Sequence, residues 1–225
     1  MFSSVLYFGR QNCKYSKILE KYLKNNSRKF VSIKSNFKKE VIKQKLISNK
    51  KFDYIFCFRS YFILNKKILN NCKYAINFHP SLPKYRGVGG VNYAIYNKDK
   101  FFGSTIHLMD KKIDNGKILK INKFRISKTD NVETLLDKTH KSMFFEAKKF
   151  ISQIIRNQNI LEILSKKTKV QWSKKYYNLK SLDEFYKINP NISKKLLERK
   201  LRSTIYQNYK PYILVHGIKF LIKQN

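Results

Sequence analysis

A chain of 225 residues can form one domain of ordinary size with an appendage, or two small domains. Apolar residues make up 42% of it and aromatic residues 15%, which is enough for a substantial core and excludes an intrinsically disordered chain. The formal net charge of +35 would suit nucleic acid or an anionic membrane surface, but charge by itself speaks only to solubility and non-specific binding.

The positive charge comes mainly from lysine. Only eight of the 49 basic residues are arginines, and the lysines are scattered along the chain beside many Asn and Ile residues. This pattern is typical of a compositional bias that places lysines on solvated helix faces. We therefore expect no nucleic-acid partner, although a positive field would favour a phosphate-bearing small substrate.

The cysteine and hydropathy patterns bear on the compartment. Cys13, Cys57 and Cys72 form neither a CxxC pair nor a Cys/His pattern with metal-ligand spacing, so we expect no disulfide, no metal and a reducing cytoplasm. The apolar run at the N-terminus is too short for a signal peptide. No stretch approaches the roughly 20 apolar residues of a membrane-spanning helix, so we expect no membrane insertion.

The first third of the chain alternates short apolar runs with helical patterns. Strands are predicted at residues 5–8, 54–58 and 74–79. Helices are predicted around residues 18–23, 37–47 and 61–70. Strand followed by helix is typical of an α/β fold, here an open, mostly parallel, twisted sheet flanked by helices.

The pattern continues through the middle of the chain. We expect a short helix at residues 90–96, strands at 104–109 and 118–126, and a long helix opening at the capping signal Asp130-x-x-Glu133. The apolar face of that helix consists of Leu136, Met143, Phe144, Ala147, Ile151 and Ile154.

The composition changes after Ser165. Lysine-rich loops surround Trp172, a helix is expected from Ser193, and residues 212–222 read as a hairpin that turns at His216-Gly217. We therefore divide the chain into a core at 1–164 and a small extension at 165–225, which contains a helix and a β-hairpin and packs on the core.

The candidate site lies at the end of the predicted strand 74–79. Alternate residues of a strand point to one face, so Asn77 and His79 share a crevice at the carboxyl end, where open α/β sheets bind ligands. Taken by themselves, an Asn and a His at this spacing are more often a loop-capping amide and a hydrogen-bonded structural histidine. The following glycine-rich loop could bring backbone amides to an anion, and Asp110 or Asp114 could return to pair with His79.

Two motifs carry a family resemblance. The segment NFHPSLPKYRGVGG, followed by GSTIHLMDKKIDNGKIL, resembles the paired signature of the formyltransferases that use 10-formyltetrahydrofolate. The resemblance is strong over residues 50–125 and weak in the N-terminal third. It implies a Rossmann-like core, 10-formyltetrahydrofolate as the formyl donor, and a catalytic trio of Asn77, His79 and Asp114. His107 matches a strand histidine that is not known as catalytic.

One departure from the signature concerns the loop. A single Leu82 stands between Ser81 and Pro83, where many family members have two leucines.

The chemistry of the family explains these residue types. A substrate amine attacks the formyl carbon, an oxyanion develops, and a proton leaves the amine nitrogen. Asn77 can donate to the oxyanion, His79 can accept or relay the proton, and Asp114 can orient the imidazole.

Three branches of the family differ in the amine that they formylate. Methionyl-tRNA formyltransferases append about a hundred residues, whereas only about 60 follow the core here. Glycinamide ribonucleotide formyltransferases open with a Gly-rich phosphate loop, which the segment FGRQNCKYS does not resemble. The sugar-nucleotide N-formyltransferases fit better, through Tyr85 to Gly89, the strand segment His107-Leu108-Met109 and the C-terminal segment. This branch implies a nucleotide-linked amino sugar of a surface glycan and a homodimer.

The resemblance to this branch implies two binding sets. The substrate set, for the diphosphate and its surroundings, is Arg10, Lys84, Tyr85 and Arg86. The folate set is Tyr61, Ile63, Asp110, Lys111, Lys112 and Ile113.

Other interpretations concern single residues and the class of protein. We interpret Trp172 as a packing anchor rather than a nucleobase platform, and His140 and His216 as structural or solvent-facing. A competing class is a non-catalytic formyltransferase-like protein that binds RNA or an acidic partner. The presence of all three catalytic positions speaks against it.

Overall fold

The computed structural model describes residues 1–36, 47 and 50–222. The helix predicted at 37–47 falls almost entirely outside these residues.

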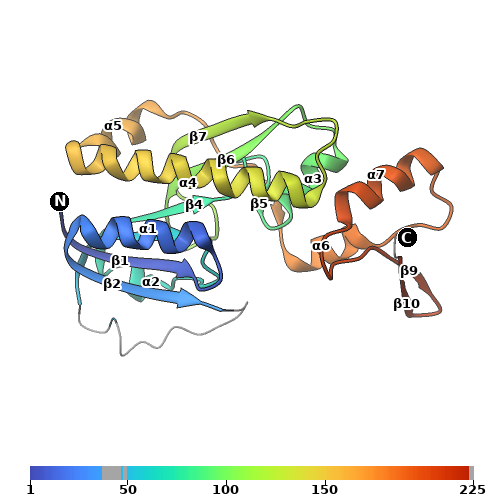
Figure 1. The fold of residues 1–225 in the computed structure, drawn as a ribbon, viewed down its shortest axis with the longest axis horizontal. Coiled ribbons are helices and arrows are strands. Elements are labelled where there is room, and N and C mark those ends of the chain that lie inside the picture. Colours follow the sequence, from blue (N-terminus) through green and yellow to red (C-terminus); the bar gives the residue numbers. More distant parts are fainter. Residues whose placement is uncertain (37–46, 48–49, 223–225) are drawn as a thin grey trace.

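A sheet of six strands forms the core, in the order β2-β1-β3-β4-β6-β7 (Figure 1). Its strands are β1 (Phe2–Arg10), β2 (Ser27–Ser35), β3 (Phe52–Phe58), β4 (Cys72–His79), β6 (Phe101–Leu108) and β7 (Ile118–Arg125). The first four strands along the chain pair in parallel. The predicted open, mostly parallel α/β sheet is therefore confirmed. The edge strand β2 was not predicted from the sequence.

The last two strands of the sheet run antiparallel to their neighbours. The chain from β4 to β6 contains one helix, α3 (Gly90–Tyr96), of seven residues. Such a helix spans roughly 10 Å, whereas the eight residues of β4 span roughly 26 Å. The connection therefore stays near the carboxyl edge, and β6 enters the sheet from there.

Helices cover both faces of the sheet. The long helices α1 (Lys14–Asn25) and α4 (Val132–Arg156) lie side by side on one face (Figure 1) and share a core cluster with the sheet. The other face packs against α2 (Lys66–Leu69), which is shorter than the predicted helix at 61–70.

The capping signal of α4 differs from the prediction. The cap is Asn131, which forms a capping box with Thr134. Asp130 is buried and accepts hydrogen bonds from the Ser127 amide and from Lys138. The one-residue shift places Asn131, rather than the acid, at the helix end.

The predicted boundary at 164/165 falls inside a helix, α5 (Ile160–Lys167). The extension then adds β8 (Tyr176–Tyr177), α6 (Leu179–Tyr186), α7 (Lys194–Thr204), β9 (Tyr212–Val215) and β10 (Ile218–Leu221). Strand β8 pairs with β5 (Arg86–Gly87) of the core.

Buried hydrogen bonds join the extension to the core. Asn92 of α3 donates to the Tyr186 hydroxyl and to the Ser203 carbonyl oxygen. The predicted hairpin of β9 and β10 is present, and it turns at His216 and Gly217, both with positive φ.

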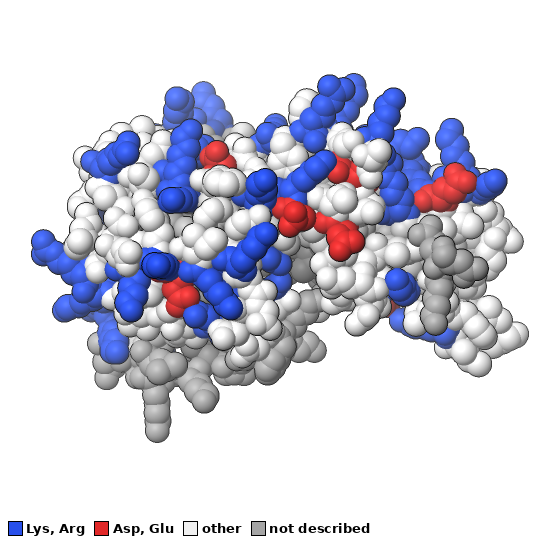
Figure 2. All heavy atoms as spheres, viewed as in Figure 1, with Lys and Arg blue, Asp and Glu red and all other residues white. Residues whose placement is uncertain are grey.

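Basic side chains are spread widely over the surface. Figure 2 shows Lys and Arg over both the sheet domain and the extension on the face in view, rather than in one patch. In the part of the chain that the structure describes, no helix is both long and apolar enough to cross a membrane.

Candidate active site

Asn77 and His79 lie near the carboxyl end of β4. In the sheet register, Asn77 faces His107 and His79 faces Thr105 on the antiparallel β6. Directly opposed residues point to the same side of a sheet. The topology therefore adds His107 to the pair that the sequence predicts.

The turn after β6 brings Asp114 to this pair. One carboxylate oxygen, Oδ2, lies 3.3 Å from His79 Nδ1 and accepts from the Gly87 amide at 3.2 Å. The other, Oδ1, accepts from Asn77 Nδ2 at 3.4 Å and lies 3.5 Å from His107 Nε2. Asp114 has a φ of 45°, a left-handed conformation that Asp tolerates better than most residues.

Burial and charge set the ionisation of the trio. Burial by itself would raise the pKa of Asp114, but the neighbouring His79 and the Gly87 amide oppose it, and the net effect holds that pKa below its ordinary value. Burial lowers the pKa of His79; Asp114 and the Tyr85 carbonyl oppose this, and His107 adds to it. The resting site therefore holds an ionised carboxylate beside a neutral imidazole.

The surroundings of His79 suit its protonated form. Nδ1 faces the Asp114 carboxylate, and Nε2 lies 3.2 Å from the carbonyl oxygen of Tyr85. A neutral ring has one N–H and can donate to only one of these acceptors, whereas the imidazolium donates to both. When the N–H is on Nδ1, Nε2 is the nitrogen that can accept a proton. The imidazolium formed in this way would donate from Nε2 to the Tyr85 carbonyl oxygen.

His107 fixes the orientation of the Asn77 amide. Its Nδ1 lies 2.8 Å from the Leu108 carbonyl oxygen, which can only accept, so Nδ1 carries the proton. In that tautomer Nε2 carries no proton and accepts from Asn77 Nδ2 at 3.0 Å. The Asn77 nitrogen thus faces the site, with one N–H on His107 and the other in the longer bond to Asp114.

The three residues of the substrate set in the glycine-rich loop each contact another part of the protein. Arg86 donates through Nε to the Ile113 carbonyl oxygen and so ties this loop to the turn before Asp114. Lys84 pairs with Asp99. The Tyr85 side chain is fully buried, and its hydroxyl donates to Asp99. The side chains of Lys84 and Tyr85 are thus both engaged by Asp99. Tyr85 contacts the trio through its carbonyl oxygen, at His79.

Arg10 belongs to a basic cluster that the sequence did not reveal. Phe8 pairs with Cys57, and Arg59, which follows β3, lies close enough to Arg10 to lower its pKa. Arg10 stacks on the Tyr61 ring at 3.8 Å, and its buried Nε has no hydrogen-bond partner. None of the ion pairs among the described residues includes Arg10 or Arg59.

The electrostatics of this cluster follow from its unbalanced charge. Burial and the nearby Arg59 lower the pKa of Arg10. His140 of α4 is half-buried, and burial together with Arg59 and Arg10 lowers its pKa to about 3. The two guanidinium groups therefore lie beside a neutral histidine, without a neutralising acid.

The folate set falls in two places: residues 110–113 directly precede Asp114, whereas Tyr61 lies against Arg10. Ile63 and Ile113 are exposed apolar side chains, at 73% and 41%. Asp110 shapes the turn by accepting from the Lys112 amide and from Asn115 Nδ2. Lys111 and Lys112 are exposed, whereas Tyr61 lies under Arg10.

Trp172 also reaches the trio. Its ring centroid lies 5.6 Å from that of His79 and 4.9 Å from that of His107, both edge to face. The predicted role as a packing anchor did not include these neighbours, because no local signal relates residue 172 to residues 79 and 107.

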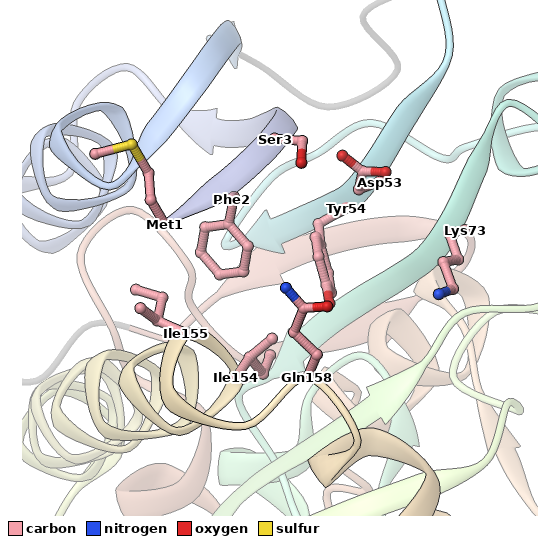
Figure 3. A pocket seen from close by; sticks show the side chains of 9 residues that line it. All are labelled: Met1, Phe2, Ser3, Asp53, Tyr54, Lys73, Ile154, Ile155 and Gln158. Carbon is pink, nitrogen blue, oxygen red and sulfur yellow. The ribbon is translucent and has the colours of Figure 1, made fainter.

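A separate small cavity lies at the opposite, amino edge of the sheet. It has a volume of about 80 Å³ and is lined by residues such as Phe2, Tyr54 and Ile154 (Figure 3). These residues come from the beginnings of β1 and β3 and the end of α4. The cavity therefore takes no part in the candidate active site.

A family model agrees with the fold and the site. The model described as formyl transferase matches residues 6–154. The chain therefore belongs to the formyl transferase family.

Curated relatives match over part of their length. The chain is 42% identical over 102 residues to the methionyl-tRNA formyltransferase of Wolbachia pipientis subsp. Culex pipiens (strain wPip). The aligned residues cover 44% of this chain and 34% of that protein. The chain thus spans about a third of the length of this relative.

Solved structures match over nearly the whole chain. A sugar N-formyltransferase from Shewanella sp FDAARGOS_354 is 19% identical with a TM-score of 0.72, covering 99% of this chain and 97% of that one. An N-formyltransferase from Helicobacter canadensis, in complex with folinic acid and dTDP-3-aminofucose, is 20% identical with a TM-score of 0.69, covering 96% and 86%. At these identities the matches show a shared fold.

Proposed function

We propose that this chain is an N-formyltransferase that moves a formyl group from 10-formyltetrahydrofolate to the amine of a nucleotide-linked amino sugar, for use in a surface glycan. The observation that carries the proposal is the Asp114 carboxylate, which meets His79 at one oxygen and Asn77 at the other.

The geometry supports distinct roles for the trio. The amine nitrogen bonds to the formyl carbon, the bond from that carbon to N10 of the folate breaks, and N10 takes up a proton. His79, neutral at rest, accepts the proton of the amine, and Asp114 stabilises the imidazolium. Asn77 can exchange its long 3.4 Å bond to Asp114 for the developing oxyanion, while His107 keeps its other N–H.

The donor site is proposed at the folate set. Exposed Ile113 can cover a face of a flat ring system, and Asp110 holds the turn that presents Ile113. The Helicobacter canadensis neighbour, which contains folinic acid, supports a folate in this fold.

The acceptor is proposed to bind with its phosphates at Arg10 and Arg59. Two guanidinium groups without an acid partner, one with an unpaired buried nitrogen, are suited to a diphosphate. Arg59 was not in the predicted set. Tyr206 of the extension is close enough to Arg10 to affect its pKa, so the extension borders this cluster.

A homodimer is proposed through the hairpin. The pairs Phe220–Ile213 and Ile218–Val215 put four apolar residues on one of its faces. Ile218 and Phe220 are exposed at 61% and 55%. A second copy of this face would cover them.

One experiment tests the activity. The purified protein is incubated with 10-formyltetrahydrofolate and a panel of amines: nucleotide-linked amino sugars, glycinamide ribonucleotide and methionyl-tRNA. Mass spectrometry should show a sugar nucleotide that has gained the mass of one carbonyl group. Transfer to methionyl-tRNA and to no sugar would refute the proposed substrate. No transfer to any amine, with salt-dependent RNA binding, would favour the non-catalytic class.

A further inference from the structure

Trp172 joins the C-terminal extension to the trio by three contacts. Its ring lies edge to face with both His79 and His107. Its Nε1 donates to the Gly116 carbonyl oxygen at 2.7 Å, two residues beyond Asp114. It is also the sole tryptophan of the chain.

The hydrogen bond to Gly116 holds a tightly packed turn. A Cβ at position 116 would collide with the carbonyl oxygen of Leu108, so the backbone of Gly116 lies directly on the end of β6. The same Leu108 oxygen accepts from His107 Nδ1. Trp172 therefore packs against both the turn that carries Asp114 and the end of β6 that orients His107.

The indole ring also shields the imidazoles from water. His79 and His107 are only 4% and 2% exposed, while Trp172 itself is half-buried. Burial is the largest influence on the ionisation of His79, which Asp114 and His107 modify. Part of that burial comes from a residue outside the matched family region, which ends at residue 154.

We propose that Trp172 is a positioning residue of the formyl transfer: its indole N–H holds the turn that carries Asp114, and its ring holds the two imidazoles. The inference rests on the proposed transfer chemistry. It makes the extension part of the active site, because the core supplies the trio and the extension sets its geometry.

Two substitutions separate the two parts of this role. Trp172→Phe keeps a ring but loses the N–H donor, and Trp172→Ala loses both. We expect kcat to fall roughly 3- to 10-fold in the first and roughly 100-fold in the second, since a misplacement of about 1 Å can cost about 10² in rate. The KM values should change less than kcat. Phe145→Ala, at an exposed position on α4, is the control and should keep wild-type kcat.

The pH profile distinguishes positioning from loss of packing. Removing the indole exposes His79, so its pKa should rise toward the ordinary value and the acid limb of kcat/KM should move to higher pH in Trp172→Ala. In Trp172→Phe the limb should stay near that of the wild type. An unmoved limb in Trp172→Ala, or a kcat within 3-fold of wild type, would overturn the proposal.

Tryptophan emission tests the contact without any substrate. Imidazolium quenches a neighbouring indole, so wild-type emission should fall as the pH drops through the ionisation of His79, while circular dichroism stays constant. The fall should be smaller in His79→Gln, in which His107 still faces the indole at 4.9 Å, and unchanged in the hairpin control His216→Gln. Emission that responds identically in all three proteins would refute the contact. A correct emission result without transfer to any amine would refute the proposed function and leave the contact intact.

Discussion

Asp114 Oδ2 and His79 Nδ1 lie 3.3 Å apart, and the two side chains are 8% and 5% exposed. A buried carboxylate stays ionised only when its partners offset the cost of burial. Here His79 and the Gly87 amide help to do so, and the net effect on the Asp114 pKa is downward. The ionised Asp114 in turn opposes the lowering of the His79 pKa by burial.

Replacing Asp114 with Asn tests the role of this charge. Asn tolerates the left-handed φ of position 114, so the turn should keep its conformation. Without the carboxylate the imidazolium loses its counter-charge, and we expect kcat to fall by about 10²–10⁴, the range for positioned acid–base groups. Steady-state kinetics with the preferred amine measures the loss.

An acid outside the trio and outside both binding sets provides the control for this prediction. Asp137→Asn changes an exposed acid on α4 and should leave kcat within about 3-fold. Near-normal kcat in Asp114→Asn would remove Asp114 from the catalytic machinery.

The lowered pKa of His79 predicts how stability depends on pH. A group with a folded pKa below its unfolded value binds fewer protons when folded, so stability is lost as the pH falls. For His79 the loss begins near the ordinary value of 6.5 and continues down to the folded pKa. Urea unfolding of wild type and His79→Gln at several pH values below 7 should show a smaller loss in the variant.

The comparison needs a histidine that does not share this environment. His216→Gln, in the exposed hairpin turn, should lose stability with falling pH as the wild type does. Equal slopes for wild type and His79→Gln would show that His79 titrates alike in the folded and unfolded states.

Most strands of the sheet could be predicted from the sequence, and so could the shared direction of Asn77 and His79. The continuous apolar runs of β3 and β4 are typical of buried parallel strands, and the spacing of Asn77 and His79 is that of one strand face. The direction of β6 depends on the length of the connection around α3, which no single strand pattern reveals. The edge strand β2, with the sequence SRKFVSIKS, contains too many polar residues to stand out.

The partners of the trio depend on contacts between distant segments. His107 joins Asn77 through an antiparallel register, Arg59, which follows β3, lies close to Arg10, and Trp172 arrives from the extension. A pattern along the chain shows each residue's own element but not its neighbour across the sheet. The proximity of the trio was thus expected from the sequence, its chemistry remains a proposal, and its supporting residues required the fold.

His107 offers a prediction about the Asn77 amide. A glutamine at position 107 can present its carbonyl oxygen where Nε2 accepts from Asn77, whereas leucine cannot. We expect His107→Leu to lower kcat by roughly 10–100-fold, as for a weakened oxyanion donor, and His107→Gln to recover most of it. Equal losses in both variants would show that the acceptor at Nε2 is not what matters.

The cluster of Arg10 and Arg59 predicts a change in substrate affinity. Hydrogen bonds to charged groups contribute about 1.5–3 kcal/mol, so Arg10→Ala or Arg59→Ala should raise the KM for the sugar nucleotide by roughly 10–100-fold. The KM for the folate should stay nearly constant. Arg28→Ala, at an exposed position on β2, should change neither KM. A rise in the folate KM instead would place the donor at the arginines.

The apolar face of the hairpin predicts the oligomeric state. A two-stranded hairpin is marginally stable on its own, and this one leaves Ile218 and Phe220 exposed on one face. Wild-type protein should sediment as a dimer at micromolar concentration, and Ile218→Lys with Phe220→Lys should sediment as a monomer. Leu221→Lys, on the opposite face and 60% exposed, is the control and should remain dimeric. A monomeric wild type, or a double variant that stays dimeric, would exclude this face as the interface.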